Sequence, residues 1–279
     1  MDFLAEILGL KRERLRPLIE DERAKEELRA RAHDARGGAS PHRLRGALDE
    51  RGRVNIIAEI KRASPSKGTI RAGVDPVWMA RKYEAGGAAA ISVLTEEDRF
   101  RGSLADLRAV REVVSLPLLR KDFIFDEFQL YEAAEAGADA LLLIVAMLDD
   151  ESLARLIRIT EGELGMDALV EVHSHEELSR ALACGATLIG VNNRDLRTFG
   201  VSLDISVALA LAAPDGLSLV SESGLRSGDD LRRLRSLGYK GFLIGETLMR
   251  APEPDNALRE LIQEAERGND EGRNEGRQR

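Results

Sequence analysis

The sequence predicts an α/β fold, a (β/α)8 TIM barrel with an N-terminal helical extension. Apolar segments of strand length alternate with helical segments, which is the pattern of a parallel sheet joined by crossover helices. Eight such pairs fit between residues 51 and 266, and a closed barrel of this kind contains eight. Polar side chains directly follow the apolar segments, and this fold carries its sites at the carboxyl ends of the strands.

The strands and helices are predicted from residue pattern and composition. The first strand, Asn55–Ile60, lacks the alternation of a half-exposed strand, so we expect it to be buried on both faces. Seven further strands are expected in AAAISVLTEE (88–97), LPLLRKDF (116–123), ADALLLIVAML (138–148), DALVEVH (167–173), LIGVNNRDL (188–196), LSLVSESG (217–224) and GFLIGETL (241–248). Helices are expected at Pro76–Glu84, Leu104–Val114, Asp126–Ala136, Asp150–Glu163, His175–Cys184, Ile205–Leu211, Ser227–Ser236 and Pro254–Arg267. Several end in glycine, as at Gly137, where a left-handed cap costs little.

Two segments lie outside the predicted barrel of residues 51–266. Residues 1–50 are rich in Leu, Glu and Arg and are expected to form a helical extension, interrupted at Pro17. Such an extension either caps the barrel mouth or only packs beside it, and the sequence leaves both open. Residues 267–279, RGNDEGRNEGRQR, have no apolar residue, so we expect a disordered tail.

Composition narrows the class of protein. The net charge of −8 and the lack of a basic stripe in the sequence argue against nucleic-acid binding. The longest apolar run, LLLIVAML, is too short to span a membrane, and the first residues, MDFLAEIL, do not resemble a cleavable signal. The single cysteine, Cys184, excludes an internal disulfide and fits a reducing compartment. We therefore expect a cytoplasmic protein that binds neither nucleic acid nor membrane.

Acids and bases follow several of the expected strands. Glu59 and Lys61 are two residues apart on an extended chain, so they point the same way and place a carboxylate beside an ammonium. Lys121, Glu171 and Asn192 follow three other strands. A single residue of this kind could serve a structural ion pair, but so many charges at strand ends are costly to bury, and stability does not require them all. We expect one functional site.

His173 and His175 invite a metal-site interpretation. Two histidines two residues apart at a strand end, without a clear third ligand, are more often capping or surface residues. We therefore expect no metal.

Six motifs occur in order along the chain: IIAEIKRASPSKG, PLLRKDFIFDEFQLYEAAEAGADALLLI, LVEVHSHEEL, IGVNNRDLRTF, SESGLRS and FLIGETLMR. Together they resemble the indole-3-glycerol phosphate synthase family, from Leu4 to Glu266. The resemblance implies a carboxy-lyase of tryptophan biosynthesis that converts 1-(2-carboxyphenylamino)-1-deoxyribulose 5-phosphate to indole-3-glycerol phosphate, with loss of carbon dioxide and water. It implies a phosphorylated small-molecule substrate, no metal and no organic cofactor. We also expect a monomer, with association with other tryptophan-pathway enzymes left open.

The resemblance assigns catalytic roles to five residues. Lys121 resembles the acid beside the substrate's ketone oxygen, where charge develops as the anthranilate carbon attacks. Lys61 resembles the lysine that contacts the substrate carboxylate. Glu171 resembles the acidic partner of the catalytic lysine, and Glu59 resembles a carboxylate suited to proton abstraction, with their division of labour left open. Asn192 resembles a residue that orients the substrate and the neighbouring carboxylates.

The expected substrate-binding residues come from the same strand ends and the first loop. In this fold the loops after strands seven and eight hold a phosphate through backbone N–H groups. The resemblance assigns the phosphate to Ser64, Ser223, Gly224 and Gly245, and places Glu222 beside them. It assigns substrate orientation to Arg194 and the anthranilate pocket to Phe123, while Leu94 and Leu143 either line the same wall or pack in the core.

Two alternative functions stay open. Phosphoribosylanthranilate isomerase and the tryptophan synthase α subunit are phosphate-binding barrels of the same pathway, but they would not need EIKRASPS together with RKDF. A non-catalytic phosphosugar-binding barrel is compatible with the fold alone. The set Lys61, Lys121 and Glu171 favours the enzyme.

Overall fold

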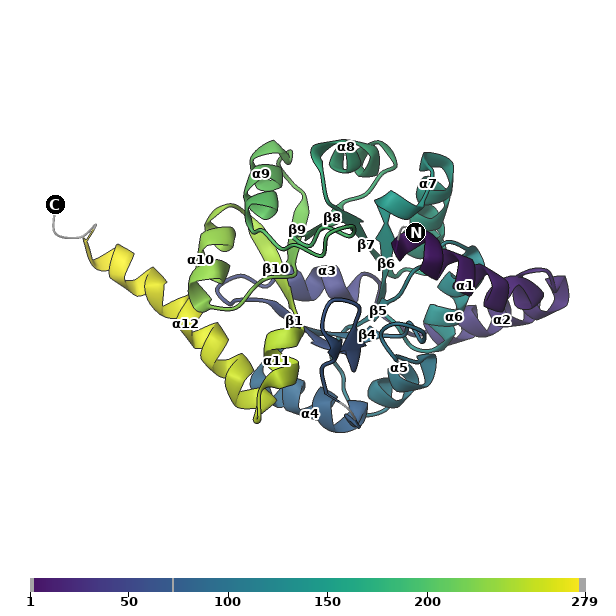
Figure 1. Cartoon of the computed structure of the whole chain (residues 1–279), viewed down its shortest axis with the longest axis horizontal. Coiled ribbons are helices and arrows are strands. Elements are labelled where there is room, and N and C mark those ends of the chain that lie inside the picture. Colours follow the sequence, from purple (N-terminus) through teal and green to yellow (C-terminus); the bar gives the residue numbers. More distant parts are fainter. Residues whose placement is uncertain (1–2, 72, 276–279) are drawn as a thin grey trace.

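The computed structural model describes residues 3–71 and 73–275, which form a closed barrel of eight parallel strands surrounded by helices (Figure 1). In order around the barrel the strands are β1 (Ile56–Ile60), β4 (Ala90–Leu94), β5 (Leu118–Lys121), β6 (Ala140–Ile144), β7 (Asp167–Val172), β8 (Leu188–Asn192), β9 (Ser218–Glu222) and β10 (Tyr239–Ile244). The barrel closes where Ile57 of β1 pairs with Leu243 of β10. The predicted (β/α)8 fold with N-terminal helices is confirmed.

Helices alternate with the strands as predicted. They are α4 (Pro76–Gly86), α5 (Leu104–Arg111), α6 (Glu127–Glu135), α7 (Asp150–Arg158), α8 (His175–Ala183), α9 (Asp204–Ala212), α10 (Gly228–Ser236) and α12 (Pro254–Glu275), with η1 (Val145–Met147) before α7 and η2 (Ile159–Glu163) after it. Two features were not predicted: a short helix, α11 (Glu246–Arg250), after the last strand, and a small hairpin, β2 (Ala63–Ser64) and β3 (Gly68–Thr69), after the first.

The strands are buried on both faces, and their side chains alternate between two apolar clusters. The interior cluster fills the barrel with Ile57, Ala90, Leu119, Ala140, Leu142, Ile144, Leu169, Leu188, Val220 and Leu243. The outer cluster packs strands against helices and includes Leu141 and Leu143 of β6. Adjacent residues of one strand therefore face different surroundings, and this alternation decides which side chains can reach a site at the mouth.

The N-terminal extension consists of α1 (Phe3–Ile19), α2 (Glu22–Arg36) and α3 (Arg43–Leu48). Helix α2 lies beside α6 on the outside of the barrel (Figure 1). Leu44 and Leu48 of α3 join the interior cluster, so α3 covers the barrel at the amino ends of the strands. Helix α1 continues two residues beyond the expected break at Pro17, which removes one backbone hydrogen bond and is followed closely by the end of the helix.

A buried aspartate ties this extension to the amino ends of the strands. Asp139, just before β6, lies 2.9 Å from Nη1 of both Arg43 and Arg111 and 3.5 Å from Arg36 Nη1. The same carboxylate accepts a hydrogen bond of 3.0 Å from the backbone N–H of Leu118. Three guanidinium groups thus surround one carboxylate that is 2% exposed.

A second aspartate, one strand further on, also ties the extension to the barrel. Asp167, the first residue of β7, accepts a hydrogen bond of 2.9 Å from the backbone N–H of Arg45. Its other oxygen lies 3.1 Å from Nδ1 of His42, at the start of α3. Both ends of α3's first turn are therefore fixed to the barrel.

The last helix differs from the expectation for the chain end. Helix α12 continues to Glu275, whereas the composition after Arg267 predicted no structure; residues 276–279 lie outside the described part. A helix that is already nucleated gains one backbone hydrogen bond per added residue, so it can continue beyond its packed portion. Its apolar contacts with the barrel come from Leu258, Leu261 and Ala265. Within residues 3–71 and 73–275, no helix is both long and apolar enough to span a membrane.

Candidate active site

A cavity of about 760 Å³ lies at the carboxyl ends of the barrel strands. All five predicted catalytic residues line it: Glu59 of β1, Lys61 just after β1, Lys121 of β5, Glu171 of β7 and Asn192 of β8. The predicted binding residues Ser64, Leu94, Phe123, Arg194, Glu222, Ser223, Gly224 and Gly245 line it as well. The fold thus collects these residues because parallel strands all end at the same edge of the barrel.

Lys121 lies at the centre of a buried group of carboxylates. Its Nζ is 2.7 Å from Oε2 of Glu222 and 3.4 Å from Oε2 of Glu171. Burial lowers the pKa of the Lys121 ammonium, but the carboxylates of Glu222 and Glu171 outweigh burial and raise it above its ordinary value. Lys121 is therefore fully protonated near neutral pH and is able to donate a proton or a hydrogen bond.

Glu171 and Glu222 share this lysine but differ in proton affinity. Burial raises the pKa of Glu171, but Lys121 and a hydrogen bond with His173 outweigh it and lower the pKa to about 2. Burial raises the pKa of Glu222 to about 7 against the effect of Lys121, and the charge of Glu171 adds to the rise. Two carboxyl groups whose pKa values are separated in this way suit different proton-transfer roles.

Two glycines leave room for the carboxylates. A Cβ atom on Gly190 of β8 would overlap Oε1 of Glu222, and one on Gly245 would overlap Oε2 of Glu59. Glu59 forms an ion pair with Lys61, as their spacing predicts. Any larger residue at Gly190 or Gly245 would displace an acidic group of the site.

Cations and backbone polar groups also line the cavity. Ser223 and Gly224 have φ angles of 64° and 84°, so the chain turns sharply after β9. Arg194 donates to the Ser66 hydroxyl (3.3 Å) in the loop after β1, and its backbone N–H donates to Asn192 Oδ1 (3.0 Å). Lys67 and Arg226 also line the cavity, although the sequence did not predict them as site residues.

The apolar wall of the cavity is larger than predicted. Phe123 and Leu94 line it as expected, together with Phe100, Phe199, Leu142 and Ile144. Phe3 of α1 joins them, with its ring centroid 6.2 Å from that of Phe123 and 5.4 Å from that of Phe199. Helix α1 therefore reaches the cavity, which answers the question that the sequence left open about the extension. No local pattern around Phe3 marks it, because its partners are distant in the chain.

One predicted binding residue is wrong. Leu143 is fully buried in the outer cluster between β6 and the helices and does not line the cavity. Side chains alternate along a strand, so its neighbours Leu142 and Ile144 face the cavity in its place. Glu171 faces inward and pairs in register with Ile144, but that register is not visible in the sequence.

His173 has a defined environment. Its Nε2 lies 3.3 Å from Oε1 of Glu171, and its Nδ1 lies 3.1 Å from Oε2 of Glu177. Burial lowers the pKa of His173, but the two carboxylates raise it to about 10, so the ring is protonated at neutral pH. A doubly protonated imidazole has no lone pair for a metal, and the described residues include no cluster of three or more His, Cys, Asp or Glu side chains suited to one.

Comparison with known proteins identifies the family. A family model described as indole-3-glycerol phosphate synthase matches residues 5–261. The chain belongs to the indole-3-glycerol phosphate synthase family. The family member from Carboxydothermus hydrogenoformans is 52% identical over 93% of this chain and 99% of its own length. The member from Syntrophobacter fumaroxidans is 45% identical over 94% of this chain and 97% of its own.

Comparison with solved structures supports only the fold. A 3-hexulose-6-phosphate synthase from Salmonella typhimurium superposes with a TM-score of 0.61 at 16% identity, covering 75% of this chain and 97% of its own. A thiamine phosphate pyrophosphorylase from Pyrococcus furiosus superposes with a TM-score of 0.58 at 19% identity, covering 80% of this chain and 98% of its own. At this identity the similarity establishes a shared barrel, not a shared reaction.

Proposed function

We propose that this chain has the activity that its family name states and makes indole-3-glycerol phosphate in tryptophan biosynthesis. Its substrate is 1-(2-carboxyphenylamino)-1-deoxyribulose 5-phosphate, and the products are indole-3-glycerol phosphate, carbon dioxide and water. One observation carries the proposal: a buried, protonated lysine held by two carboxylates, Lys121 with Glu171 and Glu222, lines one cavity together with aromatic side chains and further cations. Such a lining suits a substrate that carries both an aromatic ring and a phosphate.

Ring closure is the step assigned to Lys121. The anthranilate carbon attacks the substrate's ketone, and the Lys121 ammonium donates its proton to the ketone oxygen as negative charge develops there. Lys61 lies across the mouth next to Glu59 and pairs with the carboxylate on the anthranilate ring. Loss of carbon dioxide then restores the aromatic ring, so the energy of rearomatisation drives decarboxylation.

Dehydration requires one group to protonate the leaving hydroxyl and another to remove a proton. Glu222 retains a proton up to about pH 7, whereas Glu171 is ionised and forms an ion pair with the protonated His173. We assign proton donation to the Lys121 and Glu222 pair and orientation of Lys121 to Glu171. Glu59, which forms an ion pair with Lys61, is placed to accept the ring proton.

The phosphate is assigned to the turn after β9 and the start of α11. Ser223, Gly224 and Gly245 present backbone there, and Ser64 adds a hydroxyl from the first loop. Arg194, tied to Ser66, links this end to Asn192. We further propose that the chain acts as a monomer in the cytoplasm, which gel filtration and cell fractionation would test.

The test is incubation of the purified chain with the carboxyphenylamino-deoxyribulose phosphate while indole fluorescence is followed. We expect fluorescence to rise, and to rise equally after exhaustive treatment with EDTA, because no assigned step uses a Lewis acid. A folded protein that binds the substrate without forming indole would instead favour a phosphosugar-binding barrel. Activity lost with EDTA and restored by a divalent ion would show that a metal takes part.

A further inference from the structure

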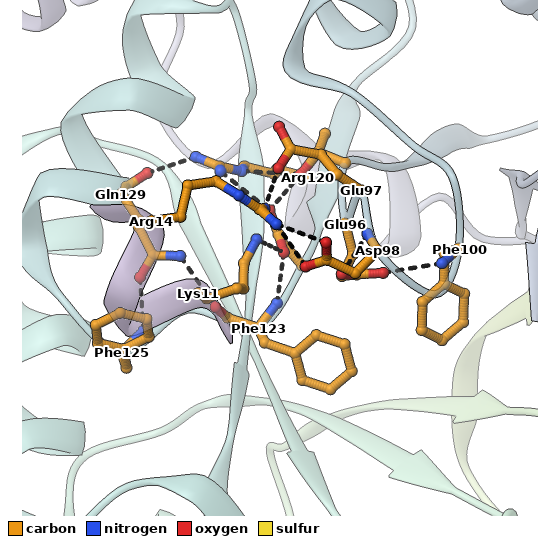
Figure 2. A network of polar contacts seen from close by, with 12 residues as sticks. Lys11, Arg14, Glu96, Glu97, Asp98, Phe100, Arg120, Phe123, Phe125 and Gln129 are labelled. Carbon is orange, nitrogen blue, oxygen red and sulfur yellow. Dashed lines mark hydrogen bonds and ion pairs between the residues drawn. The ribbon is translucent and has the colours of Figure 1, made fainter. Parts of the chain in front are cut away.

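A lysine from the N-terminal extension is buried next to the catalytic strand. Lys11 of α1 is 4% exposed, and its Nζ lies 2.5 Å from Oδ1 of Asp122 (Figure 2). Asp122 lies in the chain between Lys121 and Phe123, and all three residues line the cavity. The ion pair therefore joins α1 to the point where β5 ends and the site begins.

Asp122 is bonded on every side. Oδ1 also accepts the backbone N–H of Phe123 at 2.8 Å, while Oδ2 accepts the Thr95 hydroxyl at 2.7 Å and lies 3.0 Å from Arg120 Nη2. Burial raises the pKa of Asp122, but Lys11 and Arg120 outweigh it and keep it below its ordinary value. The carboxylate is therefore ionised, and its orientation is fixed from four directions.

The charges balance only when Lys11 is counted. Arg120 is itself buried and pairs with Glu132 at 2.7 Å as well as with Asp122. One guanidinium thus serves two carboxylates, and the Lys11 ammonium supplies the second positive charge. Without Lys11, one negative charge would be left unbalanced beside Lys121, the neighbouring cation in the chain.

The same helix also fixes the loop after β4. Arg14 Nη2 lies 2.6 Å from Asp98 Oδ1, and its Nη1 pairs with Glu97 (Figure 2). Glu96 accepts the backbone N–H of Phe100 at 2.8 Å, and the Phe100 ring lies 6.2 Å from that of Phe123 in the cavity wall. Side chains of helix α1 thus hold the ends of the adjacent strands β4 and β5. Of these contacts, the one made by Lys11 is buried.

We propose that Lys11 is a positioning residue for the ring-closure reaction: by pairing with Asp122 it fixes the end of β5 and with it the position of Lys121. This inference rests on the function proposed above. Unlike the aspartate pairs at the amino ends of the strands, this buried ion pair lies directly beside Lys121 in the chain. Lys11 does not touch the cavity, so its effect reaches the substrate only through Asp122 and Lys121.

The test compares Lys11→Met with Lys11→Arg and with a control at the other end of the barrel. Arg43→Met removes an ion pair between the extension and a buried aspartate, Asp139, far from the cavity. We expect Lys11→Met to lower kcat by about tenfold with KM within about twofold, because only the placement of the acid changes. Lys11→Arg restores the charge and should regain most of kcat, whereas Arg43→Met should lower the melting temperature and keep kcat.

Two outcomes would overturn the inference: a normal kcat in Lys11→Met, or an equal loss of kcat in Arg43→Met. If Lys11→Met does not fold, the double variant Lys11→Met with Asp122→Asn removes both charges and leaves Arg120 balanced by Glu132. A normal kcat in that double variant would also refute the role. Absence of indole from the wild-type chain would instead refute the proposed function, so the two failures are distinguishable.

Discussion

The two ends of the barrel bury charged groups in opposite ways. At the amino ends of the strands, Asp139 is surrounded by Arg36, Arg43 and Arg111 and by a backbone N–H group. At the carboxyl ends, Lys121 pairs with both Glu171 and Glu222, and Glu171 has His173 as a second partner. Within the part of the chain that the structure describes, Oε1 of Glu222 has no hydrogen-bond partner.

This difference separates structural from functional charge. At the amino end, donors exceed carboxylates and the ionisation state is fixed, which stabilises the fold. At the carboxyl end, carboxylates exceed lysines, so a proton is kept on Glu222 near neutral pH. An incompletely bonded acid is costly to stability but available to a substrate. Changes at the two ends should therefore affect different measurements.

The largest effect is expected for Lys121→Met. Charge develops on the ketone oxygen only in the transition state, so kcat should fall by roughly a hundredfold to ten-thousandfold while KM changes little. The unfolding temperature should also fall, because the buried Glu171 carboxylate loses the ammonium with which it pairs. Steady-state kinetics and thermal melting measure both. Near-normal kcat with a raised KM would mean that Lys121 only binds the substrate.

At the other end, Asp139→Asn should affect stability and spare chemistry. It leaves buried guanidinium groups without their shared carboxylate, which typically costs about 3 kcal/mol or more. The midpoint of urea unfolding should therefore shift to a lower urea concentration. Under conditions in which the variant is folded, its kcat should match that of the wild type. A loss of kcat at unchanged stability would contradict the separation of the two ends.

Glu222→Gln sharpens the comparison through pH. The folded-state pKa of Glu222 is raised to about 7, so its contribution to stability is present at acidic pH and is lost as the pH rises through 7. Relative to wild type, the glutamine variant should thus gain stability between pH 4.5 and 8, by roughly 1–3 kcal/mol. The kcat/KM profile of the wild type should show an inflection near pH 7, and that of the glutamine variant should not. Parallel stability curves for the two proteins would argue that Glu222 has an ordinary pKa.

The smallest effect is expected for removal of everything after Gly268. The residues of α12 that pack on the barrel, Leu258, Leu261 and Ala265, all remain. Activity should be unchanged, and the melting temperature should stay within about 1 °C. A drop of several degrees would mean that the last turns pack on the protein.

Sequence pattern predicted the barrel and the composition of its mouth because both depend on local regularities. Strand-length apolar runs mark each strand, and residues at their ends must meet at one edge, so Glu59, Lys121 and Glu171 could be placed together without a structure. Which side chains of β6 face the barrel interior was not predictable. Every residue in the run is apolar, so the inward and outward positions depend on the pairing with β7. Leu143 was misplaced for that reason.

Contacts made by the extension were also beyond prediction. Phe3 and Lys11 lie on an ordinary-looking amphipathic helix, and each meets a partner more than a hundred residues later, Phe123 and Asp122. Only tertiary structure selects them. The same holds for Asp139, whose three arginines come from two helices of the extension and from α5.

The extension has a consequence for the order in which the protein assembles during synthesis. Helices α1 to α3 leave the ribosome before the barrel does. The groups that hold them, Asp122 of the loop after β5, Asp139 before β6 and Asp167 of β7, are made much later. The earliest segment must therefore dock late, after at least half of the barrel has been made. A chain with its strands formed but its first helices undocked would lack both Phe3 in the cavity wall and Lys11 behind it. Catalytic competence should therefore be the last property that the nascent protein acquires.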